Sequence, residues 1–243
     1  MPILKTDSII LSISQSGEGD ITAKALTSES GKRIFVFKGL KKSRKRPQIE
    51  PGLRVEIIYY YDPKKNYHIV KEFSIISKID IIRKDLDSIY HMMYILESAD
   101  KTTAYDEKIK GLFPLVSSGI ETLGTDKKPE LITAFYTVRL LKILGILHDF
   151  SICAVCGKEL ESFSLSRKSN GPVCRQCSDP GEKAYGDIEK KFILLSVTKK
   201  FRDIKIPPEL ADSIKALHGD LVLYLELYCG MSIKCGKLIC RDF

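Results

Sequence analysis

The feature that most constrains this chain is a pair of C-x-x-C motifs. Cys153 and Cys156 form the first motif, Cys174 and Cys177 form the second, and residues 157–173 separate them. Two such motifs at this spacing are typical of structural zinc sites. Four thiolates complete a tetrahedral shell around Zn²⁺ and leave no open position for a substrate. We therefore expect a structural Zn²⁺ ion at these four cysteines and expect any activity to lie elsewhere in the chain.

The local sequence around the cysteines agrees with this prediction. Gly157 follows the first motif and permits a tight turn, and Asn170-Gly171-Pro172 predicts a turn before the second motif. Two alternatives are a redox-active C-x-x-C, which would make the chain a thiol oxidoreductase, and buried thiols without a ligand. A redox motif needs only one pair and belongs in a βαβ setting, which the sequence lacks. The other cysteines, Cys229, Cys235 and Cys240, lack ligand spacing and are expected to be buried small apolar side chains or unbonded thiols.

Composition predicts a globular protein of the cytoplasm. The chain has 243 residues, of which 44% are hydrophobic and 29% are charged. No apolar run approaches the roughly 20 residues of a membrane span. The N-terminus lacks the basic and apolar segments of a secretory signal, so the seven cysteines are expected to be reduced.

The positive charge is unevenly distributed along the chain. The net charge is +8, and Lys and Arg exceed Asp and Glu by six in residues 1–80 but by only two in residues 81–243. A local basic excess indicates a polyanionic partner, most often nucleic acid.

The pattern of apolar residues predicts two kinds of structure. Five β-forming segments separated by Gly-containing turns (8–14, 21–27, 34–38, 53–61 and 67–79) predict a small closed barrel of the oligonucleotide-binding (OB) type over residues 1–80. Residues 81–243 are predicted to form a helical domain, with the zinc module inserted at 151–179. The fold class is thus α+β and multidomain. Three apolar stripes at helical spacing are expected to face the core: Leu86, Tyr90, Met93 and Leu96; Leu131, Ala134, Phe135, Val138 and Leu141; and Leu210, Ile214, Leu217, Leu221, Tyr224 and Tyr228.

A basic segment between the third and fourth predicted strands is the candidate nucleic-acid site. Its cations are Lys38, Lys41, Lys42, Arg44, Lys45 and Arg46, with no acidic residue among them. The alternatives are a solvated loop and a nuclear import signal. Aromatic residues on the adjacent strands favour nucleic acid, since bases stack on exposed rings. Strand alternation places Phe35 and Phe37 in the core and leaves open which of Tyr59, Tyr60 and Tyr61 face outwards.

No motif in the sequence predicts catalysis. The chain lacks a phosphate-binding G-x-x-x-x-G-K-[ST] loop, H-E-x-x-H and G-x-S-x-G. Its four histidines are scattered over different predicted elements, and Asp85 and Asp87 fit the start of a helix. We therefore expect a protein that is not an enzyme and has no small-molecule substrate.

Several segments resemble the RecO family of bacterial recombination mediators. They are Leu26–Lys32 and Lys38–Ser43 in the barrel region, Tyr136–Leu141 with Leu144-Gly145 before the zinc module, and the two C-x-x-C motifs. The resemblance covers the chain in order. One departure is Thr137, which stands where the family usually has glutamate.

This resemblance implies a function in DNA repair and homologous recombination. RecO-like proteins bind single- and double-stranded DNA, anneal complementary strands, contact the C-terminal tail of single-strand-binding protein and, with RecR, help load RecA. It also implies a bacterial, nucleoid-associated protein. We expect the basic segment together with Arg33 to contact DNA, and Arg139 to lie near a partner-binding surface. An RNA-binding or transcription module with a barrel and a zinc ribbon is the alternative.

Overall fold

The computed structural model describes all residues except 17–18, 43–46, 78, 126–127, 204–210 and 241–243. The chain divides into two compact units, residues 1–126 and 127–243. None of the helices in the described ranges has the length and apolar character needed to cross a bilayer.

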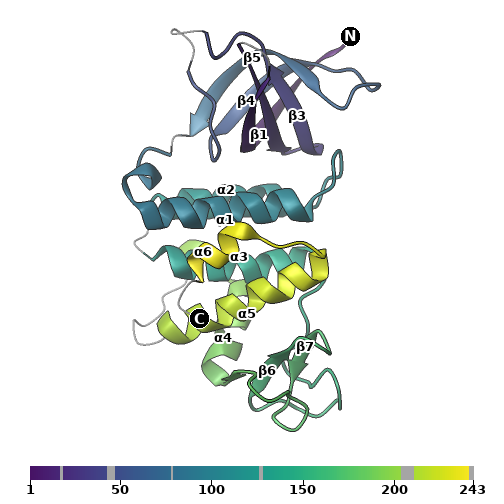
Figure 1. The fold of residues 1–243 in the computed structure, drawn as a ribbon, viewed down its shortest axis with the longest axis vertical. Helices are drawn as coiled ribbons and strands as arrows, with labels where there is room; N and C mark the ends of the chain where they lie inside the picture. Colours follow the sequence, from purple (N-terminus) through teal and green to yellow (C-terminus); the bar gives the residue numbers. More distant parts are fainter. Residues whose placement is uncertain (17–18, 43–46, 78, 126–127, 204–210, 241–243) are drawn as a thin grey trace. The chain divides into compact units, whose positions relative to one another are not determined.

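Five strands form a closed barrel in the first unit (Figure 1). They are β1 (Ile3–Ser16), β2 (Asp20–Thr27), β3 (Gly31–Phe37), β4 (Arg54–Tyr60) and β5 (His68–Ser77). Their order around the barrel is β1-β2-β3-β5-β4. All neighbouring strands are antiparallel except β3 and β5, which are parallel. The predicted five-stranded barrel is thus confirmed, with every strand in its predicted place along the chain.

Strand alternation fills the barrel interior. In β4, Val55, Ile57 and Tyr59 are buried, whereas the residues between them are half-exposed. Phe35 and Phe37 of β3 are also buried, as predicted. Because successive side chains point to opposite faces, this period of two decides which rings belong to the core.

The parallel β3–β5 junction is the shortest ladder of the barrel. It consists of two residue pairs, Phe35 with His68 and Val36 with Ile69. Aromatic side chains pack at the same place, where the His68 ring lies 5.2 Å from Tyr59 and 5.3 Å from Tyr61 between ring centroids. Ring packing therefore reinforces the barrel where few backbone pairs close it.

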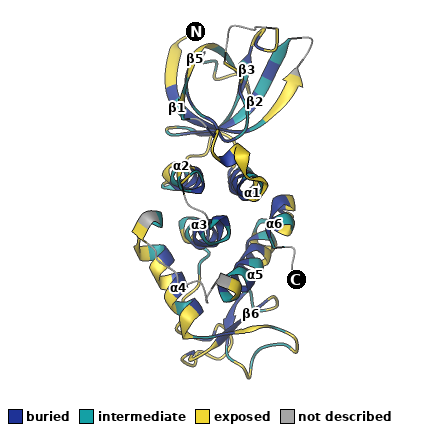
Figure 2. Cartoon of the chain, turned by 90° about the vertical axis from the view of Figure 1, so that its left-hand side faces the viewer, coloured by how far each residue is buried: buried dark blue, intermediate teal, exposed yellow. Residues whose placement is uncertain are grey.

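Two helices complete the first unit and lie across one end of the barrel (Figure 2). After a short 3₁₀ turn, η1 (Ile82–Lys84), come α1 (Leu86–Thr102) and α2 (Leu112–Leu123). Asp85 caps α1 by accepting a hydrogen bond from the Ser88 N–H at 2.9 Å, as the helix-start interpretation of this carboxylate predicts. Lys32 of β3 ties the barrel to α1, since its ammonium donates to both the backbone oxygen and the carboxylate of Asp100.

The predicted apolar stripe of α1 is confirmed only in part, because Leu96 is buried and Tyr90 is half-buried but the other two residues are exposed. Leu86 is 62% exposed and Met93 is 44% exposed. The buried face instead carries Ser88, Met92, Ile95 and Ala99. Small side chains such as Ser88 and Ala99 allow close packing here, and hydrophobicity alone does not select them. Gly52 illustrates how close α1 lies to the barrel, because a Cβ there would lie 2.5 Å from the Met92 sulfur.

The second unit is built around α3 (Pro129–Ile143), which packs against α4 (Asp187–Thr198) and α5 (Ala211–Cys229). A 3₁₀ turn, η2 (Phe201–Asp203), follows α4, and α6 (Lys234–Ile239) follows α5. Most residues of α3 are buried, and Figure 2 shows exposed residues on α4. Most residues of the two predicted stripes are buried, as expected. Tyr228 is 53% exposed, and Leu210 lies outside the described residues.

A three-stranded sheet with the order β7-β6-β8 is inserted between α3 and α4. Its strands are β6 (Phe163–Ser166), β7 (Gly171–Val173) and β8 (Ala184–Tyr185). Phe163 is buried and packs edge-on against Phe150, with ring centroids 5.0 Å apart. This small sheet supports the cysteine motifs, which have few apolar residues of their own.

The compact units and the predicted domains divide the chain differently. The first unit includes α1, whose Asp100 bonds Lys24 and Lys32 of the barrel, and α2, which packs on α1. The predicted division into a barrel domain over residues 1–80 and a helical domain over residues 81–243 stays a prediction.

Candidate nucleic-acid interface and metal centre

The described part of the basic segment starts directly after β3. Lys38, Lys41 and Lys42 are exposed, whereas Leu40 between them is fully buried. The Lys41 N–H donates to the Gly19 oxygen at 3.1 Å, and the Gly39 N–H donates to the Asp20 carboxylate at 2.8 Å. These bonds hold the start of the segment against the β1–β2 turn and leave its lysines at the surface. Arg44, Lys45 and Arg46 lie outside the described residues.

Arg33 lies in a different environment from these lysines. Its side chain is 11% exposed and pairs with Asp106 at 2.7 Å. Its guanidinium also donates to the Tyr59 hydroxyl at 2.7 Å and lies 5.3 Å from the centre of the Tyr61 ring. Arg33 therefore has internal partners, and the exposed cations nearest to it in sequence are those of the basic segment.

The structure shows which tyrosines in β4 and in the loop after it are exposed. Tyr59 is buried, and burial raises the pKa of its hydroxyl above 10.0 despite the nearby Arg33. Tyr60 and Tyr61 are half-buried, and Tyr67 is 43% exposed. His68 is buried beside these rings, and desolvation, followed by the charge of Arg33, lowers its pKa below 6.5. The rings that remain accessible for stacking are Tyr60, Tyr61 and Tyr67.

The four predicted metal ligands converge in the second unit. The sulfurs of Cys153, Cys156, Cys174 and Cys177 all lie within 4.8 Å of one another. Those of Cys156 and Cys174 are 3.8 Å apart. A tetrahedral site with Zn–S bonds of ~2.3 Å places its sulfurs about 3.8 Å apart. The cluster can therefore hold one metal ion, and its donor set of four sulfurs fits Zn²⁺.

Turns on either side aim the sulfurs at one point. The Gly157 N–H donates to the Cys153 oxygen at 2.9 Å, and Gly157 has a φ of +71°. The Cys177 N–H donates to the Cys174 oxygen at 2.9 Å in the second motif. A left-handed φ after the first motif is the conformation that favours glycine, as predicted for this turn.

The electrostatics of the cluster favour a bound cation. Burial raises the pKa of the Cys153 thiol, but hydrogen bonds from neighbouring backbone N–H groups outweigh this effect and lower the pKa to about 6. The Cys177 thiol shows the opposite shift, because its bond with Cys174 and burial raise its pKa to about 12. Four adjacent thiols cannot all ionise unless a cation balances their charge. A divalent metal ion supplies that charge.

The Arg139 side chain bonds other residues of the second unit and is not a free surface cation. Its guanidinium donates to the Ser196 oxygen at 2.7 Å and also to the Lys199 oxygen, at the C-terminal end of α4. It lies 4.6 Å from the centre of the Phe135 ring. The neighbouring Thr137 is fully buried, and its hydroxyl lies 3.0 Å from His218 Nε2. The role predicted for Arg139 in partner binding stays untested.

Comparison with protein families accounts for nearly the whole chain. The model described as "Recombination protein O N terminal" matches residues 1–79, and the one described as "Recombination protein O C terminal" matches residues 83–234.

The chain belongs to the RecO family.

Curated relatives agree with this assignment. The chain is 26% identical over 242 residues to the DNA repair protein RecO of Exiguobacterium sibiricum, with 97% of this chain and 95% of the relative covered. It is 26% identical over 210 residues to the DNA repair protein RecO of Caldanaerobacter subterraneus, with 84% of each chain covered. It is 22% identical over 240 residues to that of Listeria monocytogenes serotype 4b, with 97% and 93% covered. The predicted RecO resemblance is confirmed.

Sequence reasoning found the barrel, the basic segment and the cysteines, but it missed the contacts between the barrel and α1. Lys24, Lys32 and Asp100 form one ion-pair cluster, although Lys32 and Asp100 are 68 residues apart. A lysine in a strand with mixed burial gives no sign of such a partner. The isolated β-bridge between Lys32 and Tyr105 also has no signal in the sequence that would predict it.

Proposed function

We propose that this chain binds single- and double-stranded DNA through the basic segment on its barrel and anneals complementary strands. With RecR, it would then help load RecA onto DNA coated with single-strand-binding protein, whose C-terminal tail it contacts. The observation that carries this proposal is the exposure of Lys38, Lys41 and Lys42 beside a closed barrel, in a chain that belongs to the RecO family.

Physical chemistry explains why such a surface would anneal strands. Two complementary strands repel each other through their phosphates, and cations that neutralise phosphates reduce this repulsion. Base pairing then supplies the free energy, so no covalent chemistry is needed. Tyr60, Tyr61 and Tyr67 offer rings on which unpaired bases can stack, at ~1–3 kcal/mol each. The proposed protein is therefore a mediator and not an enzyme, and it would act in the bacterial cytoplasm at the nucleoid.

The metal ion has a supporting role in this proposal. Cys153, Cys156, Cys174 and Cys177 would hold Zn²⁺, which supplies charge balance and cross-links the loops of the small sheet. Zinc binding contributes ~10–16 kcal/mol to folding in small zinc domains. The DNA-binding cations lie in the other compact unit, so the ion need not contact DNA.

Salt dependence of DNA binding tests the proposal. Replacing Lys41, Lys42, Arg44 and Arg46 with Gln should lower affinity and make the slope of log K against log[salt] less steep by roughly 3–4 on duplex DNA, from about −5 if all six cations of the segment meet phosphates. The matched control replaces Lys158, Lys191, Lys199 and Lys200, which are exposed cations of the second unit. Both variants carry the same charge change.

The two variants should behave differently in the annealing assay as well. The basic-segment variant should anneal oligonucleotides coated with single-strand-binding protein much more slowly than the control variant. Equal affinity and equal salt slope in the two variants would show that only net charge matters and would refute the assignment of DNA binding to this segment. Competition with structured RNA separates the proposal from an RNA-binding role.

A further inference from the structure

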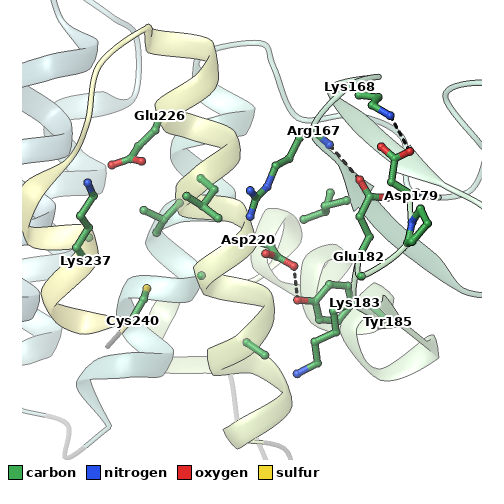
Figure 3. A pocket seen from close by; sticks show the side chains of 18 residues that line it. Arg167, Lys168, Asp179, Glu182, Lys183, Tyr185, Asp220, Glu226, Lys237 and Cys240 are labelled. Carbon is green, nitrogen blue, oxygen red and sulfur yellow. Dashed lines mark hydrogen bonds and ion pairs between the residues drawn. The ribbon is translucent and has the colours of Figure 1, made fainter. Parts of the chain in front are cut away.

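A cavity of about 740 Å³ lies in the second unit. One wall comes from β6, β8 and the loop between the cysteine motifs and β8, and the other comes from α5 and α6 (Figure 3). Ligand pockets commonly have volumes of ~300–1,000 Å³. The cavity is therefore large enough to hold a small organic molecule.

The walls of the cavity combine an apolar surface with charged side chains. Its apolar part is formed by Leu165, Tyr185, Ala216, Val222 and Leu223. Gly219 and Gly236 also line the cavity and, because they have no side chain, leave its volume unfilled. Such a surface favours an apolar group, because its burial removes that group from water.

The acidic side chains of the cavity already accept hydrogen bonds. Asp220 accepts from the Tyr185 hydroxyl at 2.7 Å, and Glu226 accepts from the Ser232 hydroxyl at 3.1 Å. Glu182 accepts from the backbone N–H groups of Arg167 and Asp179. Asp179 also pairs with Lys168 at 2.9 Å.

Two cations of the cavity differ from the acids in this respect. Within the described part of the chain, the side chains of Arg167 and Lys237 have no ion-pair or hydrogen-bond partner. Figure 3 shows the Arg167 guanidinium pointing into the cavity beside Asp220, and Lys237 rising from α6 on the other side. A guanidinium presents several N–H donors in a plane that matches a carboxylate or a phosphate. Arg167 and Lys237 therefore keep N–H donors that can contact an anion.

We propose that the cavity binds a small amphipathic anion. Its apolar body would lie against Leu165, Val222 and Leu223, and its carboxylate or phosphate would contact Arg167 and Lys237. The ligand could be an organic carboxylate or a nucleotide, since both carry an anion on a flat or apolar body. This site is independent of the proposed DNA-binding segment, because it lies wholly in the second unit.

Two probes distinguish the sources of the anion. N-acetyl-phenylalanine tests a carboxylate, and thymidine 5′-monophosphate tests a phosphate. Each is titrated into the full-length metal-loaded protein and followed by NMR chemical shifts and calorimetry, with a Kd of roughly 1 mM expected for ligands of this size. N-acetyl-phenylalanine amide, which has no charge, is the control ligand and should bind at least about tenfold more weakly than the acid.

Three variants locate the site. Arg167→Gln should weaken the bound probe at least about tenfold, since it removes a charge-assisted contact. Lys191→Gln on α4 makes the same charge change at an exposed position outside the cavity and should leave binding unchanged. Leu223→Glu places a carboxylate at a position that is 37% exposed and should weaken binding without unfolding the helix.

The result that overturns the proposal is equally specific. It fails if neither probe binds at 10 times the expected concentration, roughly 10 mM. It also fails if a probe binds Arg167→Gln and Leu223→Glu as tightly as the unmodified protein, or if the amide binds as well as the acid. Weaker binding by Arg167→Gln and Leu223→Glu but not by Lys191→Gln supports it, and the probe that binds names the source of the anion.

Discussion

Removing the Asp100 carboxylate should weaken the first unit, because it joins α1 to the barrel through two lysines. The carboxylate accepts from the ammonium groups of Lys32 at 2.9 Å and Lys24 at 3.1 Å. The Lys32 side chain is only 9% exposed, so it depends on this counter-charge. We predict that Asp100→Ala lowers the free energy of opening of the first unit by about 2–3 kcal/mol.

The magnitude follows from the exposure of the two partners. Removing one partner of a buried ion pair costs about 3–5 kcal/mol, because the other charge is left buried alone. Asp100 has a side chain that is 22% exposed, and Lys32 keeps its bond to the Asp100 backbone oxygen, so the expected loss lies below that range. Lys24 adds little, because its side chain is 40% exposed and water screens the pair.

Acidification should produce the same loss gradually. Burial raises the pKa of Asp100, but the bonds from Lys32 and Lys24 lower it more, so its pKa in the folded protein lies below 3.8. A carboxyl with a lowered pKa stabilises the fold above its unfolded pKa. That stabilisation should begin to fall near pH 4 and be lost as the pH drops through the folded pKa, and Asp100→Ala should lack this component.

Hydrogen exchange is the appropriate assay, because it reports each unit separately in the full chain. Amides of β3 and α1 should exchange faster in Asp100→Ala, while those of α5 should not change. The control is Glu29→Gln, which breaks the exposed pair with Lys108 and should cost less than about 0.5 kcal/mol. The double variant Lys32→Met with Asp100→Leu should recover most of the loss. If Asp100→Ala matches Glu29→Gln, the buried pair does not stabilise this unit.

Three further predictions concern the metal centre, a glycine and an arginine. Chelation of the metal, or Cys156→Ser with Cys177→Ser, should abolish stoichiometric zinc and speed exchange in residues 153–177, while unchanged exchange in metal-free protein would contradict a structural role. Gly31→Ala should cost about 2–4 kcal/mol, because Gly31 has a φ of +70° and a Cβ there would lie 1.9 Å from the Glu107 oxygen. Gly39→Ala, with a similar φ of +65° and no atom within 4 Å of the added Cβ, should cost only about 1–2 kcal/mol when the two variants are compared by chemical denaturation. Arg139→Ala should cost about 1–2 kcal/mol, since the Ser196 and Lys199 oxygens lose their donor, and a melting temperature equal to that of Lys191→Gln would argue against this contact.

Local patterns in the sequence were sufficient to predict the barrel. Its strands alternate between apolar and polar residues and are separated by Gly-containing turns, and both signals act over a few residues. The metal site was predictable for a similar reason. Two residues between ligands fix a turn, so Cys153 with Cys156 and Cys174 with Cys177 carry their geometry in their spacing.

Features that depend on distant residues could not be predicted. The buried face of α1 carries Met92, Ile95 and Ala99, but Leu86 and Met93 lie on its exposed side, so apolar character alone does not select the face that packs on the barrel. The cavity beside the small sheet is lined by both Arg167 and Lys237, which are 70 positions apart in the sequence. In each case the partner is chosen by tertiary packing, which short patterns do not record.

The short junction between β3 and β5 has a mechanical consequence. Only two residue pairs join β3 to β5, whereas longer ladders join the other neighbouring strands, so the barrel should open between β3 and β5 first. The packed rings of Phe35, Tyr59 and His68 hold this junction closed. The basic segment begins at Lys38, directly after β3. A force that bound DNA exerted on the basic segment would therefore act first on the β3–β5 junction.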